Sequence, residues 1–147
     1  MSEYIDTSII AKWFKKSEEQ RAESLKLRQR VIDFDVEFVF SQYGVLELVR
    51  ALVKDKYPRE DIEDSYQSIH DLFEVNALSS VPIESVIPLV KDLEIDLNLY
   101  AGDALHLASA IDYACRIFWS ADHHHLKEKT RNYMRKYNIE MKSLDDI

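Results

Sequence analysis

The sequence predicts an α/β protein whose mainly parallel sheet is covered by helices on both faces. Short apolar segments alternate with helical patterns along the 147 residues, and this alternation is typical of parallel strands joined by helical crossovers. A chain of 17.3 kDa also suffices for one core, which buries roughly 68–70% of the surface that the unfolded chain exposes. We therefore expect a single domain over residues 1–147.

Five short segments are the candidate strands, because each is apolar or rich in β-branched and aromatic residues. They are residues 3–5, 37–40, 75–78, 116–120 and 139–142. Either Thr7 or Ser8 is expected to cap the helix after the first strand, and Ser41 the helix after the second.

Between the strands, apolar residues recur at helical spacing. The helical patterns comprise Ile9 to Phe14; Leu27, Val31 and Phe34; residues 42–54; residues 59–73 after Pro58; Ile83, Val86, Ile87, Val90 and Leu93; residues 103–113; and a basic helix that Asp122 opens. The helix over residues 103–113 carries small side chains, so we expect it to lie close to the sheet.

The composition excludes several classes of site. A single cysteine, Cys115, cannot form an intramolecular disulfide or supply the cysteine pairs of a zinc ribbon or an iron–sulfur cluster. The two glycines, Gly44 and Gly102, are too few and too far apart for a dinucleotide-binding loop or a Walker A loop. The acidic N-terminus does not resemble a signal or transit peptide, and no apolar run is long enough to cross a membrane. We therefore expect a cytoplasmic protein.

The net charge of −8 does not attract nucleic acid, but the charges are unevenly distributed. Residues 12–30 contain seven basic and three acidic side chains, and residues 127–142 contain six basic and two acidic ones. Residues 60–74 contain six acidic side chains and neither Lys nor Arg. Solvated helix faces explain such runs in most proteins. The two basic stretches are nevertheless candidate contacts for a phosphate backbone.

Acidic residues lie at or near the predicted junctions between strands and helices. They are Asp6, Glu47, Asp103 and Asp122. In a parallel sheet these junctions meet at one edge, where α/β proteins bind ligands. Taken singly, Asp6 and Asp122 fit plain helix caps, and Glu47 fits a surface pair with Arg50. Together, four carboxylates suit a hard cation such as Mg²⁺ or Mn²⁺, and such a site predicts hydrolytic phosphoryl transfer.

Four segments resemble the acidic motifs of PIN domains, which are metal-dependent ribonucleases. The segments are YIDTSII at 4–10, VLELVRAL at 45–52, GDALHLASA at 102–110 and FWSADHHHL at 118–126. The resemblance implies a three-layer α/β/α sandwich in which the four acids are the catalytic metal ligands. It also implies that Thr7 or Ser8 is a supporting polar group. Many family members of this size are VapC-type toxins of toxin–antitoxin pairs.

Histidines lie beside two of these motifs. His106 follows Asp103 by three residues on the same helix face, so it is either a structural histidine of the core or a group that touches the site. Consecutive helical residues point about 100° apart, so His123, His124 and His125 are not expected to converge on one ion. PIN domains often have an apolar or aromatic residue where this chain has His125.

The resulting hypothesis is a divalent-metal-dependent endoribonuclease, in which a metal-activated water hydrolyses single-stranded or looped RNA. By resemblance, the products carry 5′-phosphate and 3′-hydroxyl ends. The candidate contacts to the RNA backbone are Lys129, Arg131, Arg135 and Lys136. Expected partners are RNA, an antitoxin protein and a second copy of the chain, which the apolar faces of residues 59–93 would contact. One alternative is a small phosphohydrolase or receiver-like domain, although Asp6 is followed by Thr7 and Ser8 and so does not begin an Asp-x-Asp pattern. The other is a non-catalytic interaction module.

Overall fold

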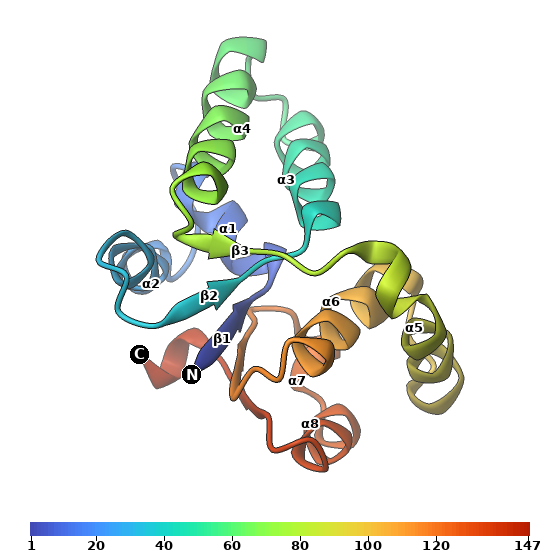
Figure 1. Ribbon diagram of the computed structural model, residues 1–147. Helices are drawn as coiled ribbons and strands as arrows, with labels where there is room; N and C mark the ends of the chain where they lie inside the picture. Colours follow the sequence, from blue (N-terminus) through green and yellow to red (C-terminus); the bar gives the residue numbers. More distant parts are fainter.

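The computed structural model describes residues 1–147 and contains a five-stranded, all-parallel sheet (Figure 1). The strands are β1 (Ser2–Ile5), β2 (Glu37–Val39), β3 (Leu78–Ser79), β4 (Ile117–Trp119) and β5 (Glu140–Lys142). Their order across the sheet is β3-β2-β1-β4-β5. The sheet is therefore extended first on one side of the central strand β1, by β2 and β3, and then on its other side, by β4 and β5. Loops diverge on either side of such a switch point and leave a crevice at the carboxyl ends of the strands.

Helices cover both faces of the sheet. They are α1 (Thr7–Phe14), α2 (Arg21–Ile32), α3 (Gln42–Lys54), α4 (Arg59–Glu74), α5 (Ile83–Leu97), α6 (Ala101–Asp112), α7 (His123–Leu126), α8 (Glu128–Arg135) and a 3₁₀ turn (Leu144–Asp146). Figure 1 shows α1 and α2 on one side of the sheet, α6 and α8 on the other, and α3 and α4 projecting together as a helical hairpin. No helix is both long and apolar enough to cross a membrane.

The core lies in two layers because successive strand residues point to opposite faces. Ile5, Phe38 and Trp119 pack beneath α1 to α4 in one cluster of buried apolar residues. Tyr4 and Phe118 pack on the other face beneath α5, α6 and α8, with their rings stacked 5.0 Å apart. The predicted parallel sheet and the three-layer α/β/α architecture are confirmed.

Some predicted boundaries were wrong, and apolar residues at helix ends are the main cause. Phe34 lies beyond the end of α2, is 58% exposed and has a φ of 54° in the left-handed region. Val75 caps α4 and is exposed, so β3 begins three residues later than predicted. Ile83 and Ile87 of the stripe on α5 are also exposed.

The basic helix predicted from Asp122 is divided into α7 and α8. Lys127 separates them, because its ψ of 146° is extended rather than helical. The guanidinium of Arg131 donates hydrogen bonds to the carbonyl oxygens of Leu126, at 2.8 Å, and Met141, at 2.9 Å. Arg131 thereby ties the break between the helices to strand β5.

Left-handed residues form the turns that lead into four of the strands. They are Phe34 before β2, Asn76 before β3, Ala114 before β4 and Asn138 before β5. A left-handed residue commonly ends a helix, and glycine or asparagine usually occupies the position. At Ala114 the turn is closed by a hydrogen bond from the N–H of Cys115 to the carbonyl of Ala110, at 2.9 Å. Ala114 thus occupies a conformation that its side chain disfavours.

Candidate active site

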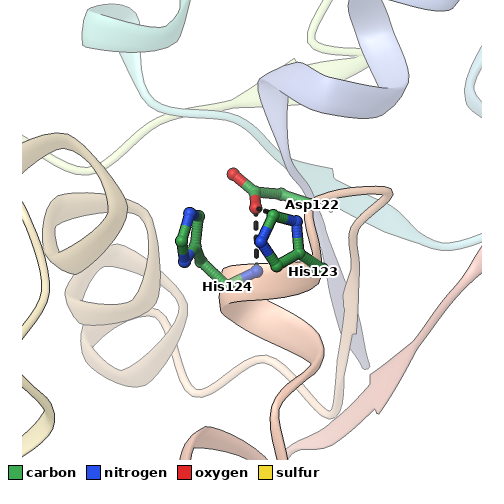
Figure 2. A group of neighbouring side chains, drawn as sticks. All are labelled: Asp122, His123 and His124. Carbon is green, nitrogen blue, oxygen red and sulfur yellow. Dashed lines mark hydrogen bonds and ion pairs between the residues drawn. The ribbon is translucent and has the colours of Figure 1, made fainter.

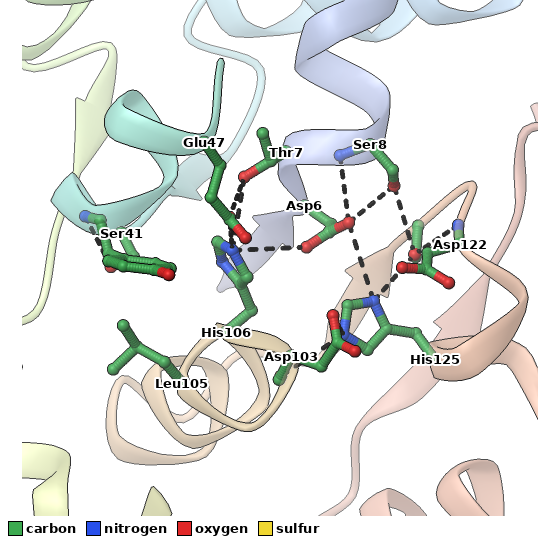
Figure 3. Close-up of polar contacts among 12 residues, drawn as sticks. Asp6, Thr7, Ser8, Ser41, Glu47, Asp103, Leu105, His106, Asp122 and His125 are labelled. Atoms are coloured by element: carbon green, nitrogen blue, oxygen red, sulfur yellow. Dashed lines mark hydrogen bonds and ion pairs between the residues drawn. The ribbon is translucent and has the colours of Figure 1, made fainter. Parts of the chain in front are cut away.

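The four predicted acids lie at the carboxyl edge of the sheet, near the switch point of its strand order (Figure 3). Asp6 directly follows β1, and Asp122 follows β4 by three residues. Asp103 lies in the first turn of α6, and Glu47 lies in α3 one turn after its start. Figure 3 shows their carboxylates directed toward a common region that also contains His106 and His125.

Asp6 is buried at the centre of this group and caps helix α1. Its Oδ2 accepts hydrogen bonds from the backbone N–H of Ser8, at 3.1 Å, and from Ser8 Oγ, at 2.6 Å. The expectation that Thr7 or Ser8 is the cap was therefore wrong, and the alternative that Asp6 caps the helix is confirmed. Burial raises the pKa of Asp6, but attraction to His106 and His125 and the bonds from Ser8 outweigh it, so the net shift is downward.

Two neighbouring side chains hold the carboxylate of Glu47 in place. Its Oε1 accepts a hydrogen bond from Thr7 Oγ1, at 2.8 Å, and a short one from His106 Nε2. No contact with Arg50 forms, so the surface-pair alternative for Glu47 is not what the structure shows. Gly102 permits the arrangement, because a Cβ there would lie 3.1 Å from Glu47 Oε2.

His106 is both a buried structural residue and a contact of the site. Its Nδ1 lies 2.5 Å from the hydroxyl of Tyr4, which in turn accepts a hydrogen bond from the backbone N–H of Ser41. Its Nε2 binds Glu47 and lies 3.7 Å from Asp6 Oδ1. Burial lowers the pKa of His106, but the carboxylates of Asp6 and Glu47 outweigh burial and raise it.

Asp103, Asp122 and His125 form one of two groups of side chains that could hold a metal ion, the other being Asp122, His123 and His124. One oxygen of each carboxylate and one ring nitrogen lie within 4.8 Å of one another. Burial raises the pKa of Asp103, attraction to His125 opposes this shift, and repulsion from Asp122 and Asp6 adds to it. A cation would relieve that repulsion. This donor set therefore fits a divalent cation.

The three consecutive histidines divide between two groups. His123 and His124 lie beside Asp122 with their rings 4.2 Å apart (Figure 2), and His124 also lines the cavity beside Asp103. His125 points inward and is buried. The three rings do not converge on one point, and Asp122 lies between the outer pair and the inner histidine.

The predicted contacts to RNA lie on α8 and just beyond its end. Lys129, Arg135 and Lys136 are exposed. Arg131 is half-buried, and its guanidinium binds backbone carbonyls.

Several site residues were not predicted. Ser120 follows β4 directly, and Ser41, which was expected only as a helix cap, follows β2 by two residues. The argument that identified the acids at strand ends would therefore also have identified both serines as site residues. Tyr100 and Lys127 line a cavity of about 300 Å³ beside Asp103. Lys127 begins the basic stretch that was expected to contact a phosphate backbone, whereas no feature of the sequence indicates Tyr100.

A sequence model of the PIN domain matches residues 4–132. The match covers most of the chain, and the chain therefore belongs to the PIN domain family, whose members are generally nucleases. No curated protein matches the sequence. A solved structure of VapBC2 from Rickettsia felis, bound to a DNA fragment from their promoter, contains a chain of similar fold. The two chains share 17% sequence identity with a TM-score of 0.61, and the similarity covers 97% of this chain and 98% of that chain.

Proposed function

We propose that the protein is a divalent-metal-dependent endoribonuclease, a hydrolase that cleaves phosphodiester bonds in single-stranded or looped RNA. The observation that carries this proposal is the convergence of Asp6, Glu47, Asp103 and Asp122 at one sheet edge of a PIN domain. These four residues would hold Mg²⁺ or Mn²⁺. The bound ion would activate water for in-line attack and stabilise charge on the leaving oxygen.

The chain's own residues prepare the carboxylates for this role. The lowered pKa of Asp6 keeps it ionised at neutral pH. Thr7 and His106 hold Glu47 in one orientation, so that this longer side chain does not have to be ordered when the ion binds. Ser8 does the same for Asp6.

RNA can reach the carboxylates from solvent. The side chains of Glu47, Asp103 and Asp122 are 32%, 21% and 29% exposed. Tyr100 is 85% exposed at the rim of the cavity beside Asp103, and Lys127 lines the same cavity. An exposed aromatic ring next to a cationic side chain is suited to stack an unpaired base and contact its phosphate. Duplex RNA buries its bases, so this surface favours single strands and loops.

We further propose that the protein is a VapC-type toxin with an antitoxin partner and that it forms a homodimer. The helical hairpin supports a protein partner, because Leu46, Val53 and Tyr66 on α3 and α4 are exposed. A groove of about 370 Å³ on this hairpin is lined by residues that include Val49 and Ile62. Light scattering of the purified chain would test the homodimer, and a monomeric mass would contradict it.

The nuclease proposal is tested by incubating the protein with a mixed RNA pool while Mn²⁺ or Mg²⁺ is titrated. We expect cleavage that depends on the ion and leaves 5′-phosphate and 3′-hydroxyl ends. Asp103→Asn should abolish cleavage, because the amide keeps the size of the side chain and removes its charge. Asp64→Asn is the matched control, since Asp64 is exposed on α4, away from the site. Cleavage that persists in Asp103→Asn, or that needs no divalent ion, would contradict the proposal.

A further inference from the structure

His125 is a buried imidazole in the wall of the candidate active site. Its side chain is 1% exposed, and its ring packs edge-on against Phe118 with the ring centroids 5.1 Å apart. A buried ring with two polar nitrogen atoms costs free energy unless both nitrogens have partners. The surroundings of each nitrogen therefore indicate what this side chain binds.

Nδ1 of His125 faces a chain of hydroxyl groups. Ser120 Oγ lies 3.1 Å from Nδ1 and 3.4 Å from Ser8 Oγ, and Ser8 donates to Asp6 Oδ2. When Nδ1 carries a hydrogen, it donates to Ser120 Oγ, Ser120 donates to Ser8 Oγ and Ser8 donates to Asp6, so every hydrogen along this row of groups has an acceptor. The N–H then also lies near the negative charge of Asp6, whose Oδ2 is 3.7 Å from Nδ1. We assign the proton of the neutral ring to Nδ1 on this basis.

Nε2 then carries a lone pair, and its nearest polar atoms are oxygens. The carbonyl oxygen of Asp103 lies 3.4 Å away and its Oδ1 lies 3.7 Å away. Both distances exceed the usual 2.7–3.2 Å of an N–H···O hydrogen bond. A lone pair beside a carboxylate oxygen is repulsive unless a cation lies between them.

A carboxylate oxygen of Asp122 completes the group. One carboxylate oxygen of Asp103, one of Asp122 and one ring nitrogen of His125 lie within 4.8 Å of one another. Two ligands of the same ion, each bound at about 2.0–2.2 Å, are at most about 4.4 Å apart. The 3.7 Å separation between Nε2 and Asp103 Oδ1 falls within that limit.

We propose that His125 is a nitrogen ligand of the divalent cation, beside Asp103 and Asp122, and that it makes the site select a transition-metal ion such as Mn²⁺ over Mg²⁺. This inference rests on the proposed function, because it concerns the same cation. Mg²⁺ prefers oxygen ligands, whereas imidazole nitrogen favours transition metals. The bond from Nδ1–H to Ser120 is the kind of outer contact that orients a metal-binding histidine.

Pulsed electron paramagnetic resonance of the full chain loaded with Mn²⁺ tests the ligand directly. We expect electron spin-echo modulation from a directly bound ¹⁴N nucleus, which changes to a ¹⁵N pattern when the protein is made with ¹⁵N-histidine. The signal should persist in the His123→Gln/His124→Gln double variant, whose changes lie outside the buried core. It should disappear in His125→Leu and in His125→Gln.

Calorimetry supplies a second measurement that does not depend on cleavage. His125→Leu should weaken Mn²⁺ binding by about tenfold or more and weaken Mg²⁺ binding much less, so the preference for Mn²⁺ should fall. Circular dichroism checks the fold of each variant, and the labelled wild-type protein and the double variant test the ligand even if both His125 variants are unfolded.

The outcomes separate this inference from the proposed function. Bound Mn²⁺ and active cleavage without nitrogen modulation would overturn the inference alone. Modulation that disappears in the His123→Gln/His124→Gln variant would also overturn it, because the nitrogen ligand would then lie in the outer pair. A protein that binds neither ion would overturn both proposals.

Discussion

The hydroxyl of Tyr4 lies 2.5 Å from Nδ1 of His106, which links the central strand to helix α6 inside the core. The same hydroxyl accepts a hydrogen bond from the N–H of Ser41 at 3.0 Å. Tyr4→Phe would leave both buried groups without this partner, so we expect the free energy of unfolding to fall by about 1–3 kcal/mol. Denaturant titration measures the change. Tyr66→Phe on the exposed face of α4 is the control and should change stability little.

The raised pKa of Asp103 predicts how the stability of the metal-free protein depends on pH. A carboxyl group whose pKa is higher in the folded state binds more protons when folded than when unfolded. Its contribution to stability is therefore complete below the unfolded pKa of about 3.9 and is lost as pH rises through the folded pKa. Asp103→Asn should remove this trend, so the variant should gain stability relative to wild type as pH rises.

Melting temperatures between pH 5 and 8, with a chelator, check that prediction. Mn²⁺ at 100 times its dissociation constant should then stabilise wild type by about 2.7 kcal/mol and should stabilise Asp103→Asn much less. A variant that is less stable than wild type across the whole pH range, in chelator, would show that the charge of Asp103 is not repelled in the empty site.

Tyr100 is expected to act on binding rather than on the chemical step. Loss of one stacked base costs about 1–3 kcal/mol, so Tyr100→Ala should raise KM for single-stranded RNA roughly 5- to 150-fold while kcat changes little. Tyr100→Phe should restore KM because it keeps the aromatic ring. Steady-state kinetics with a short RNA provide the measurement. An equal rise in KM in Tyr100→Phe and Tyr100→Ala would show that the hydroxyl group, rather than the ring, contacts the RNA.

The left-handed turn at Ala114 offers a test of backbone strain. Glycine adopts a φ of 58° without a steric penalty, so Ala114→Gly should raise the free energy of unfolding by up to about 1 kcal/mol. The same substitution at the exposed helical residue Ala22 should lower it by about 1 kcal/mol. Opposite signs in thermal melts would confirm that the backbone conformation decides the effect.

The sequence was sufficient to predict the parallel sheet and the edge at which the acids gather. Both follow from the order of the elements, since Asp6 and Asp122 come directly or almost directly after strands. Ser41 could be predicted as a cap for the same reason, and its side chain does accept a hydrogen bond from the N–H of Tyr43.

The contacts that depend on tertiary packing could not be predicted in the same way. The bond between Glu47 and His106 joins two helices whose approach depends on Gly102. The break at Lys127 has no glycine or proline to indicate it, and the apolar character of Phe34 concealed the end of α2. Which of three adjacent histidines turns inward is likewise decided by the core around His125.

The pairing of strand β1 with β4 governs when the site can form during synthesis. Glu3 is aligned with Ile117, more than a hundred residues later in the chain, and contacts of such long sequence separation form late and slowly. The first strand therefore leaves the ribosome long before β4 exists, while Asp122 and His125 emerge later still. A nascent chain therefore lacks the complete set of carboxylates until this last part of the chain has emerged.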